Sequence, residues 1–177
     1  PLQAAPEVDY YASQTGTAEL MARNAAVALE QGGVPAQVIA LSRLTPELLT
    51  QAETALFVVS TYGEGEPPDT ARGFVRRTMG KPLDLSGLRH GVLALGDREY
   101  PDFCAFGHQV DRWLCSSGAQ ALFAVIEHDH QDEVAENAWH EALQALGASG
   151  TTRGQRLPDF QPWVLVARET LNPGRPH

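Results

Sequence analysis

Lysine is almost absent from this 177-residue sequence, because Lys81 in the turn Gly80-Lys81-Pro82 is the only one. Mechanisms that need a lysine at a strand end or in a phosphate loop are therefore disfavoured. Basic residues are few as a class, with 13 Lys and Arg against 22 Asp and Glu and a formal net charge of −9. This balance argues against nucleic acid as a partner. It favours a basic surface on any protein partner, or else it simply maintains solubility.

Cysteines and long apolar runs are also scarce. Cys104 and Cys115 are eleven residues apart in one expected helix, or about 16 Å along its axis. Bridged Cα atoms lie within about 7 Å, so a disulfide between them is excluded, and without a CxxC pair there is no zinc or thioredoxin-type signal. No apolar run approaches the roughly 18–20 residues that cross a bilayer, and no signal-peptide pattern opens the sequence. We expect a cytoplasmic protein with no membrane segment.

Short apolar runs alternate with helical patterns along most of the chain. The runs cover residues 8–12, 36–41, 55–61, 91–95 and 121–126. The middle runs show little polar alternation, which is typical of strands buried on both faces. Helical spacing of apolar residues predicts helices over 18–31, around Phe74 and Val75, from Phe106 to Leu114, and from Val134 to Leu146. Five strands alternating with helices predict an α/β three-layer sandwich with a parallel sheet.

The pattern stops after Gly147. Residues 148–158 are rich in Gly, Ser, Thr and Arg without periodicity, which is typical of a linker. Residues 161–168 are expected to form one strand, and a lone strand is not a domain. We therefore expect one domain over residues 1–147. The tail, 148–177, either packs on that domain or begins a further domain that this chain lacks.

Three of the expected strands end in loops with unusual composition. The loops are Ser-Gln-Thr-Gly-Thr at 13–17, Thr-Tyr-Gly-Glu-Gly-Glu-Pro-Pro at 61–68, and Gly-Asp-Arg-Glu-Tyr-Pro-Asp-Phe at 96–103. In an open parallel sheet, ligands bind at the carboxyl ends of the strands, where the strand order reverses. We expect the three loops to meet at one crevice there.

The first loop is a candidate for phosphate binding. A turn that feeds a helix presents backbone N–H groups and the positive end of a dipole to an anion, and Ser13, Thr15 and Thr17 add hydroxyl donors. A nucleotide triphosphatase would need Gly-x4-Gly-Lys-Ser/Thr, and this loop lacks both that glycine spacing and the lysine. The loop therefore predicts a site that holds a phosphate monoester without transferring it. An ordinary capped helix start has the same composition.

Two tyrosines favour the phosphate-binding interpretation of this loop over an ordinary capped helix start. Tyr62 and Tyr100 each follow a strand end in a loop rich in glycine and proline. Two aromatic rings at one crevice can clamp a flat conjugated ligand. Together with the phosphate loop they indicate a phosphorylated, planar, aromatic ligand, and flavin mononucleotide (FMN) is the obvious member of that class.

Three segments, SQTGTAE, STYGEGEPPDTA and LGDREYPDFCAFG, resemble the flavin-binding loops of the FMN domain in the diflavin reductase family. That family includes the flavoprotein subunit of sulfite reductase and the NADPH-dependent reductases that serve haem proteins. The similarity covers roughly residues 8–147, with the three motifs in order. It implies a flavodoxin-like fold with a five-stranded parallel sheet of order 2-1-3-4-5. The tail is similar to the junction with the family's FAD-binding, ferredoxin reductase-like domain, so 148–177 is expected to be a linker and the start of that missing domain.

The resemblance also assigns roles to individual residues. It assigns the phosphate to Ser13, Gln14, Thr15, Gly16, Thr17 and Ala18. It assigns the ring stack to Tyr62 and Tyr100, and the polar edge of the flavin to the backbone of Thr61, Gly63 and Gly65. It places Leu95, Gly96 and Asp97 along the ring and ribityl chain, Phe103 and Cys104 on the far side, and Asp129 near the flavin. It assigns no catalytic or metal-binding residue. The loop of Asp129 departs from the family's acidic run by including His128 and His130.

Acidic residues cluster around the expected crevice. They are Glu64, Glu66, Asp69, Asp97, Glu99, Asp102, Glu127, Asp129, Asp132 and Glu133. They form either a docking face for a basic partner or the ordinary acidic bias of loops and first helical turns. A glycine at position 63 permits the peptide rotation by which a carbonyl can bond a protonated flavin nitrogen. Cys104 is expected to be a buried small hydrophobe rather than a redox thiol.

The resemblance implies an electron relay, not a complete enzyme: it would accept electrons from an NADPH- and FAD-binding module and pass them singly to a haem or other metal acceptor. An independent flavodoxin-type electron shuttle is the alternative. A phospho-accepting receiver domain has the same strand order, but it would need an acidic pair, an Asp and a Lys where this sequence has Ser13-Gln14, Ser60-Thr61 and Glu127-His128. A binding module without flavin is the remaining alternative.

Overall fold

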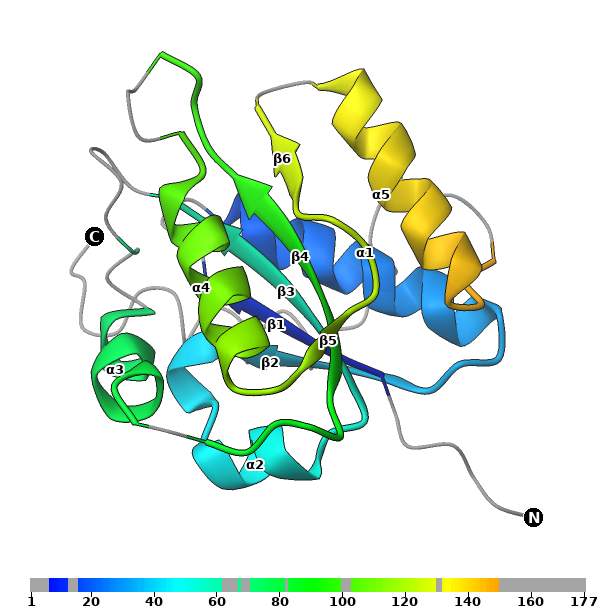
Figure 1. Ribbon diagram of the computed structural model, residues 1–177. Helices are drawn as coiled ribbons and strands as arrows, with labels where there is room; N and C mark the ends of the chain where they lie inside the picture. The colour runs from blue at the N-terminus through cyan, green and yellow to red at the C-terminus, as the bar shows by residue number, and fades with distance from the viewer. Residues whose placement is uncertain are drawn as a thin grey trace, which may run out of the picture.

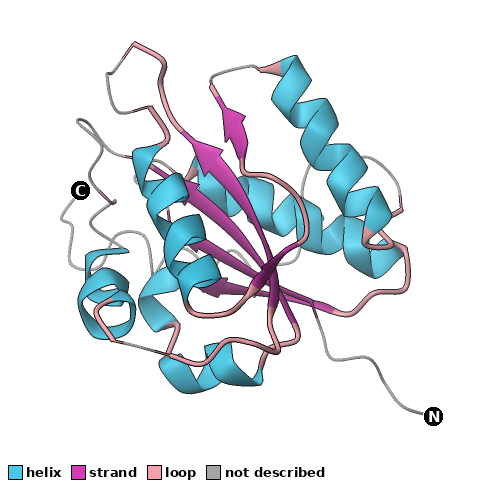
Figure 2. Ribbon diagram, in the orientation of Figure 1, coloured by secondary structure: helices cyan, strands magenta, loops and turns pink. Residues whose placement is uncertain are grey.

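The computed structural model describes the backbone of residues 7–12 and, with side chains, residues 16–61, 67, 71–81, 83–99, 103–129 and 132–149. Its centre is a parallel sheet (Figures 1 and 2). The four main strands are β1 (Glu7–Ala12), β2 (Ala36–Ala40), β3 (Thr54–Ser60) and β4 (Arg89–Leu95). The order across the sheet is β2-β1-β3-β4-β5, as predicted, and every pair is parallel.

The outer position beside β4 differs from the prediction. Two short segments, β5 (Gln120–Ala121) and β6 (Ile126–His128), pair with the beginning and the end of β4, in place of one strand over 121–126. Between them, the Phe123 ring lies over Gly91, where a Cβ on Gly91 would overlap it, and packs edge-on against Trp139. The segment leaves the ladder where this ring enters the core, so the prediction of a single fifth strand is wrong.

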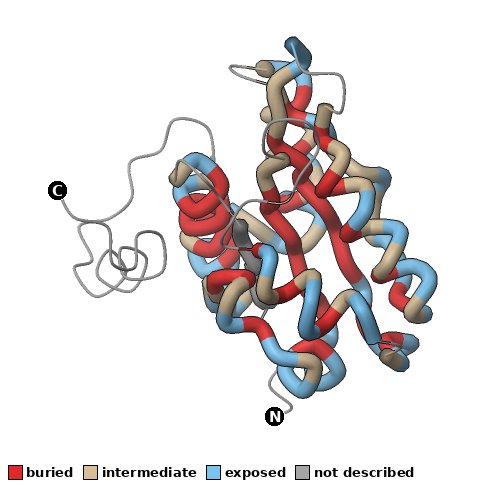
Figure 3. Tube along the Cα trace, turned by 90° about the vertical axis from the view of Figure 1, so that its left-hand side faces the viewer, coloured by how far each residue is buried: buried red, intermediate tan, exposed pale blue. Residues whose placement is uncertain are grey.

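Helices cover both faces of the sheet (Figures 1 and 3). On one face lie α1 (Thr17–Gln31) and α5 (Glu133–Ala145). On the other lie α2 (Pro46–Gln51), α3 (Arg72–Phe74) and α4 (Ala105–Ser116), with a π-helical turn, Val75–Met79, directly after α3. The three-layer α/β/α prediction is thus confirmed. None of the described helices is long and apolar enough to cross a membrane.

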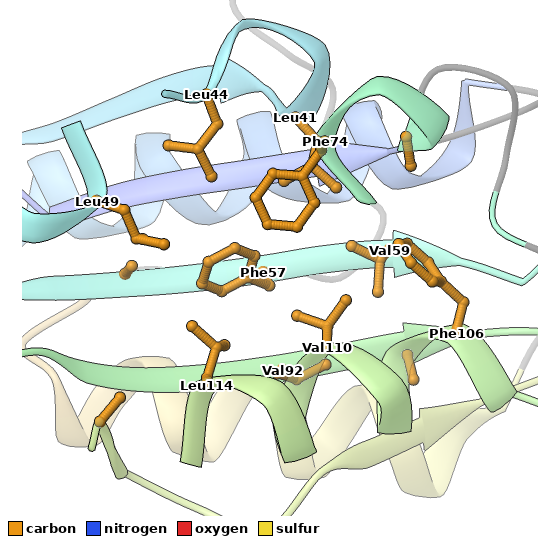
Figure 4. Packing of buried hydrophobic residues seen from close by; sticks show 14 of the residues in the cluster. Leu41, Leu44, Leu49, Phe57, Val59, Phe74, Val92, Phe106, Val110 and Leu114 are labelled. Carbon is orange, nitrogen blue, oxygen red and sulfur yellow. The ribbon is translucent and has the colours of Figure 1, made fainter. Parts of the chain in front are cut away.

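Burial of β3 and β4 on both faces explains the unbroken apolar runs of the sequence. Along β3, Phe57 and Val59 face the α4 side (Figure 4), while Leu56 and Val58 face the α1 side. All four are fully buried. Successive side chains of a strand point to opposite faces, so a strand covered on both faces needs apolar residues at every position.

Helix α2 was not predicted, although its start has a recognisable signal. Thr45 accepts a hydrogen bond from the Leu48 N–H at 3.2 Å through its hydroxyl, and Pro46 occupies the first helical position. A threonine cap followed by proline is a typical helix start.

At the other end of the chain, Val134 was expected on the buried stripe of the last helix, but 80% of it is exposed.

Residues 146–149, directly after α5, remain attached to the domain. Gly147 has a φ of +109°, which closes the helix, and the Ser149 N–H donates to the Ala28 carbonyl at 2.9 Å. The described residues continue to Ser149, and the domain boundary expected at 147 stays a prediction. The predicted strand over 161–168 lies outside the described residues.

Candidate functional site

The carboxyl ends of the strands are aligned at one edge of the sheet. The register pairs Ala12 with Val59, Ser60 with Leu95, and Leu95 with His128. Neighbouring strands lie about 4.8 Å apart, so four loops start within roughly 15 Å of one another along this edge. The described strand ends therefore lie side by side, and the crevice expected between the three loops stays a prediction. Ser13, Gln14, Thr15, Tyr62, Gly63, Gly65 and Tyr100 lie outside the described residues.

Helix α1 begins at this edge. Gly16 stands at its N-cap with φ +92° and ψ −8°, and a Cβ added to Gly16 would have no atom of the described residues within 4 Å. The Leu20 N–H bonds the Gly16 carbonyl at 3.0 Å, which starts the helix. A helix start with open space beside a glycine offers backbone N–H groups and the positive end of the dipole to an anion. Thr17 is exposed next to it, whereas Ala18 is fully buried in the core.

Thr61, after β3, ties three elements together. Its N–H donates to the Leu95 carbonyl at 2.9 Å, and its hydroxyl accepts from the Phe106 N–H at 2.9 Å. The hydroxyl therefore caps the start of α4 from a neighbouring strand, a role that sequence reasoning missed. The expected contact between the Thr61 backbone and a ligand is limited accordingly, because its N–H is already used within the sheet.

The loop after β4 is closely packed. The Gly96 N–H donates to the His128 carbonyl at 3.0 Å. A Cβ on Gly96 would lie 2.9 Å from the Cys104 nitrogen and 3.0 Å from the Phe103 ring, so only glycine fits without displacing the loop. Asp97 accepts the Glu99 N–H at 2.9 Å, which forms a tight turn. The Leu95 side chain belongs to the core, so only its backbone is positioned toward the site edge.

Arg98 connects this loop to α5. Its guanidinium lies 5.3 Å from the centre of the Phe103 ring and donates to Asp132 at 3.2 Å. Asp132 caps α5 by accepting the Ala135 N–H at 3.0 Å. The bonds from the backbone N–H groups of Ala135 and Asp129, with the nearby Arg98 charge, lower the pKa of Asp132. Neither Arg98 nor Asp132 was expected to position the loop, although an aspartate followed by the acidic first turn of α5 is a recognisable helix start.

Cys104 adopts a left-handed conformation, with φ 59°, directly before α4. Its thiol donates to the Ala94 carbonyl at 3.1 Å, and the residue is fully buried. Burial raises the pKa of this thiol to about 12. The expectation of a buried small hydrophobe is confirmed, and the thiol shapes the loop from inside rather than lining its surface.

The two thiols should differ strongly in reactivity. At pH 8, a thiol with a pKa of about 12 has almost no thiolate, and Cys104 is also inaccessible, whereas Cys115 is exposed. Partial desolvation and the Asp111 carboxylate raise the pKa of Cys115 as well, so it should react more slowly than a free cysteine but much faster than Cys104. We expect one such accessible thiol per folded, metal-free chain with a disulfide reagent and two after denaturation. A Cys115→Ser variant should lose the rapid phase. Rapid reaction of both thiols in the native protein would contradict the buried position of Cys104.

The acidic residues of this edge are partly paired. The Glu127 carboxylate lies 2.6 Å from His108 Nε2, which links β6 to α4, and His128 Nε2 lies 3.6 Å from Glu136 Oε1. Asp129 is half-buried at the end of β6 and directs its N–H at Asp132. Of the predicted site, the structure thus brings Gly16, Thr17, Gly96, Asp97 and Asp129 to one edge, with Phe103 half-buried behind it.

Comparison with known proteins decides the family. The sequence model of the flavodoxin family matches residues 10–141 of this chain. The chain belongs to the flavodoxin family. Solved flavodoxins have the same fold: that of Streptococcus pneumoniae has a TM-score of 0.69 at 29% identity, covering 80% of this chain and 99% of that one. A point mutant of the flavodoxin from Pseudomonas aeruginosa has a TM-score of 0.69 at 27% identity, covering 80% and 96%.

Longer relatives of this flavodoxin domain are sulfite reductase flavoproteins. The NADPH-sulfite reductase flavoprotein alpha-component of Bacillus subtilis is 39% identical over 142 residues, which are 79% of this chain and 24% of the relative. The corresponding protein of Neisseria meningitidis serogroup C is 33% identical over 165 residues, or 93% and 27%. The chain spans about a quarter of the length of these relatives. They confirm the resemblance to the FMN domain of the diflavin reductases, and FMN is the cofactor of this family.

Proposed function

We propose that this chain is an FMN-binding electron-transfer domain that receives electrons from an NADPH- and FAD-binding reductase module and passes them singly to a haem or other metal acceptor. The observation that carries the proposal is the alignment of four strand ends with the start of α1 in a flavodoxin-family chain related to sulfite reductase flavoproteins. FMN supplies the redox chemistry, and the chain supplies binding, orientation and electrostatics.

The described residues suit the two ends of FMN differently. The start of α1, where Gly16 has a left-handed conformation, would hold the phosphate through backbone N–H groups and the helix dipole. The packed loop of Gly96 and Asp97, fixed by the His128 carbonyl and the Glu99 N–H, would lie along the ribityl chain and ring. Tyr62 and Tyr100 would stack on the ring. We infer that Ser13, Gln14 and Thr15 would join the phosphate site, and Gly63 and Gly65 the polar edge of the flavin.

The length of the relatives and the acidic residues at the carboxyl edge of the sheet indicate which proteins this chain exchanges electrons with. The relatives are about four times longer than the matched region, which supports residues 148–177 as a lead into an FAD-binding domain. Asp97, Glu99, Asp129 and Glu133 stand at or beside the carboxyl edge, where the cofactor would be exposed. An acidic rim raises the rate of association with a basic acceptor and is screened by salt. The independent shuttle remains the second candidate, since solved flavodoxins match almost their whole length.

The first experiment measures cofactor binding and reduction. The chain, refolded or purified with FMN, should hold one FMN per chain and should bind riboflavin at least about tenfold more weakly, because riboflavin lacks the phosphate that the start of α1 would hold. A reductive titration should resolve two one-electron steps. Equal affinity for riboflavin would contradict the phosphate site, and a single two-electron step would contradict the relay. Reduction by NADPH only after addition of a sulfite reductase FAD module would favour the relay over the shuttle.

A further inference from the structure

Three metal-ligating side chains converge at the opposite end of the sheet from the flavin site. His90 is the second residue of β4, and Asp111 and Cys115 occupy successive turns of α4. Helix α4 packs on β4 (Figure 1). Their ligand atoms all lie within 4.8 Å of one another. Residues at i and i+4 share a helix face, so a strand and one helix face contribute together. No role in FMN binding uses these residues.

The distances suit a tetrahedral zinc ion. His90 Nε2 lies 2.9 Å from Asp111 Oδ1 and 3.9 Å from Cys115 Sγ. Zinc bonds of about 2.0–2.3 Å place N and O ligands about 3.3 Å apart and N and S ligands about 3.5 Å apart. Shifts of roughly half an ångström would therefore bring both pairs to zinc geometry. Imidazole, carboxylate and thiolate are all ligands of this borderline-soft ion.

A nucleophilic triad does not explain the arrangement. In such a triad, the acid and the nucleophile contact different nitrogens of the histidine ring. Here Asp111 and Cys115 both approach Nε2, and Nδ1 is buried without a hydrogen-bond partner among the described residues.

An ordinary histidine–carboxylate pair explains only part of the arrangement. A single imidazole nitrogen has one proton or one lone pair, so the 2.9 Å bond to Asp111 leaves Nε2 at most a weak shared contact with Cys115 at 3.9 Å. A cation between the three atoms would be bonded by all of them at once. His90 is fully buried, the Asp111 side chain is 24% exposed and Cys115 is exposed, so the group opens to solvent on one side. A water molecule can occupy the fourth position from there.

We infer that His90, Asp111 and Cys115 form a zinc-binding site that fastens the second half of α4 to the beginning of β4. His90 precedes Leu95, at the flavin edge, by five residues, or about 16 Å of strand. Zinc has no redox chemistry, so an ion at this site would take no part in electron transfer. Sequence patterns do not reveal it, because one ligand is 21 residues from the next and no CxxC pair is present.

The test is a zinc titration of the untagged, FMN-loaded chain by calorimetry. We expect one zinc per chain, with an increased melting temperature on zinc addition. Cys115→Ser and Asp111→Asn should each weaken zinc binding at least about 100-fold, since removal of second-shell partners alone weakens metal sites 10–100-fold. Both positions reach the surface, so folding is retained and is checked by circular dichroism. Glu141→Gln, an exposed carboxylate on α5 across the sheet, is the matched control and should bind zinc normally.

Cobalt(II) provides a second readout that does not depend on heat. A tetrahedral thiolate site gives cobalt bands in the red, where oxidised flavin does not absorb, and Cys115→Ser should abolish them. No zinc binding, or zinc binding unchanged by Cys115→Ser, would overturn the inference. The FMN content of the same samples is measured in parallel. A chain that binds zinc but no FMN would refute the proposed function alone, and the reverse result would refute the zinc site alone.

Discussion

Gly16→Val is expected to lower the affinity for FMN at least about tenfold, which corresponds to roughly 1.4 kcal/mol or more. The φ of +92° at Gly16 is strained for any residue with a Cβ and most of all for a β-branched one. The helix start would relax toward negative φ and turn its N–H groups away from the phosphate. The free energy of unfolding should also fall by about 1–3 kcal/mol. Fluorescence quenching of FMN and thermal unfolding measure the two effects.

The other end of α1 provides the matched control. Gly33 has a φ of +87°, and a Cβ added at Gly33 or at Gly16 would meet no atom of the described residues within 4 Å. Gly33→Val therefore introduces the same backbone strain without touching the flavin edge. It should destabilise the protein by a similar amount and leave the FMN affinity of the folded protein unchanged. Equal FMN affinities in the two variants would disprove the phosphate-binding role of the α1 start.

Gly107→Val should reduce the free energy of unfolding by about 3 kcal/mol, at the upper end of the usual range for overpacking. A Cβ at Gly107 would lie 2.3 Å from the Ala94 Cβ and 3.1 Å from the Ala94 Cα, so α4 would have to move away from β4. The gain in helix propensity over glycine is only a few tenths of a kcal/mol for valine, so the steric effect dominates. Urea unfolding followed by circular dichroism measures the change.

A double-mutant cycle isolates this contact. Ala94→Gly removes the Cβ that lies nearest, so Gly107→Ala should cost less in the Ala94→Gly background than in the native one. Gly87→Ala, where a Cβ would meet nothing within 4 Å, is the control for the general effect of replacing a glycine. If the changes in unfolding free energy caused by Ala94→Gly and Gly107→Ala simply add, α4 does not contact β4 at this point.

Much of the fold could be predicted because burial imposes a pattern. The runs that became β3 and β4 are apolar at nearly every position, and the apolar spacing of α1 and α5 is helical, so these elements were found within two residues. The outer strand could not be predicted, because its interruption depends on the Phe123 ring meeting Gly91, and that contact is distant in sequence. Local propensity contains no information on such a contact.

In the candidate site too, local features could be predicted from the sequence, whereas contacts between distant residues could not. The glycines and the loop positions were recognisable from composition and resemblance. The bonds that hold the loops were not, because Thr61 caps a helix 45 residues away and Arg98 reaches Asp132 across 34 residues. The left-handed conformation of Cys104 was also unexpected, since such a φ is uncommon for residues other than glycine, asparagine and aspartate.

The interrupted outer strand has a consequence for self-association. A long, regular edge strand is a template onto which a second molecule can add a strand, and natural proteins shorten or break such edges. Because β5 has two residues and β6 has three, with a break between them, neither presents the continuous ladder that this addition requires. Any aggregation through the described sheet would therefore start at its other margin, along β2.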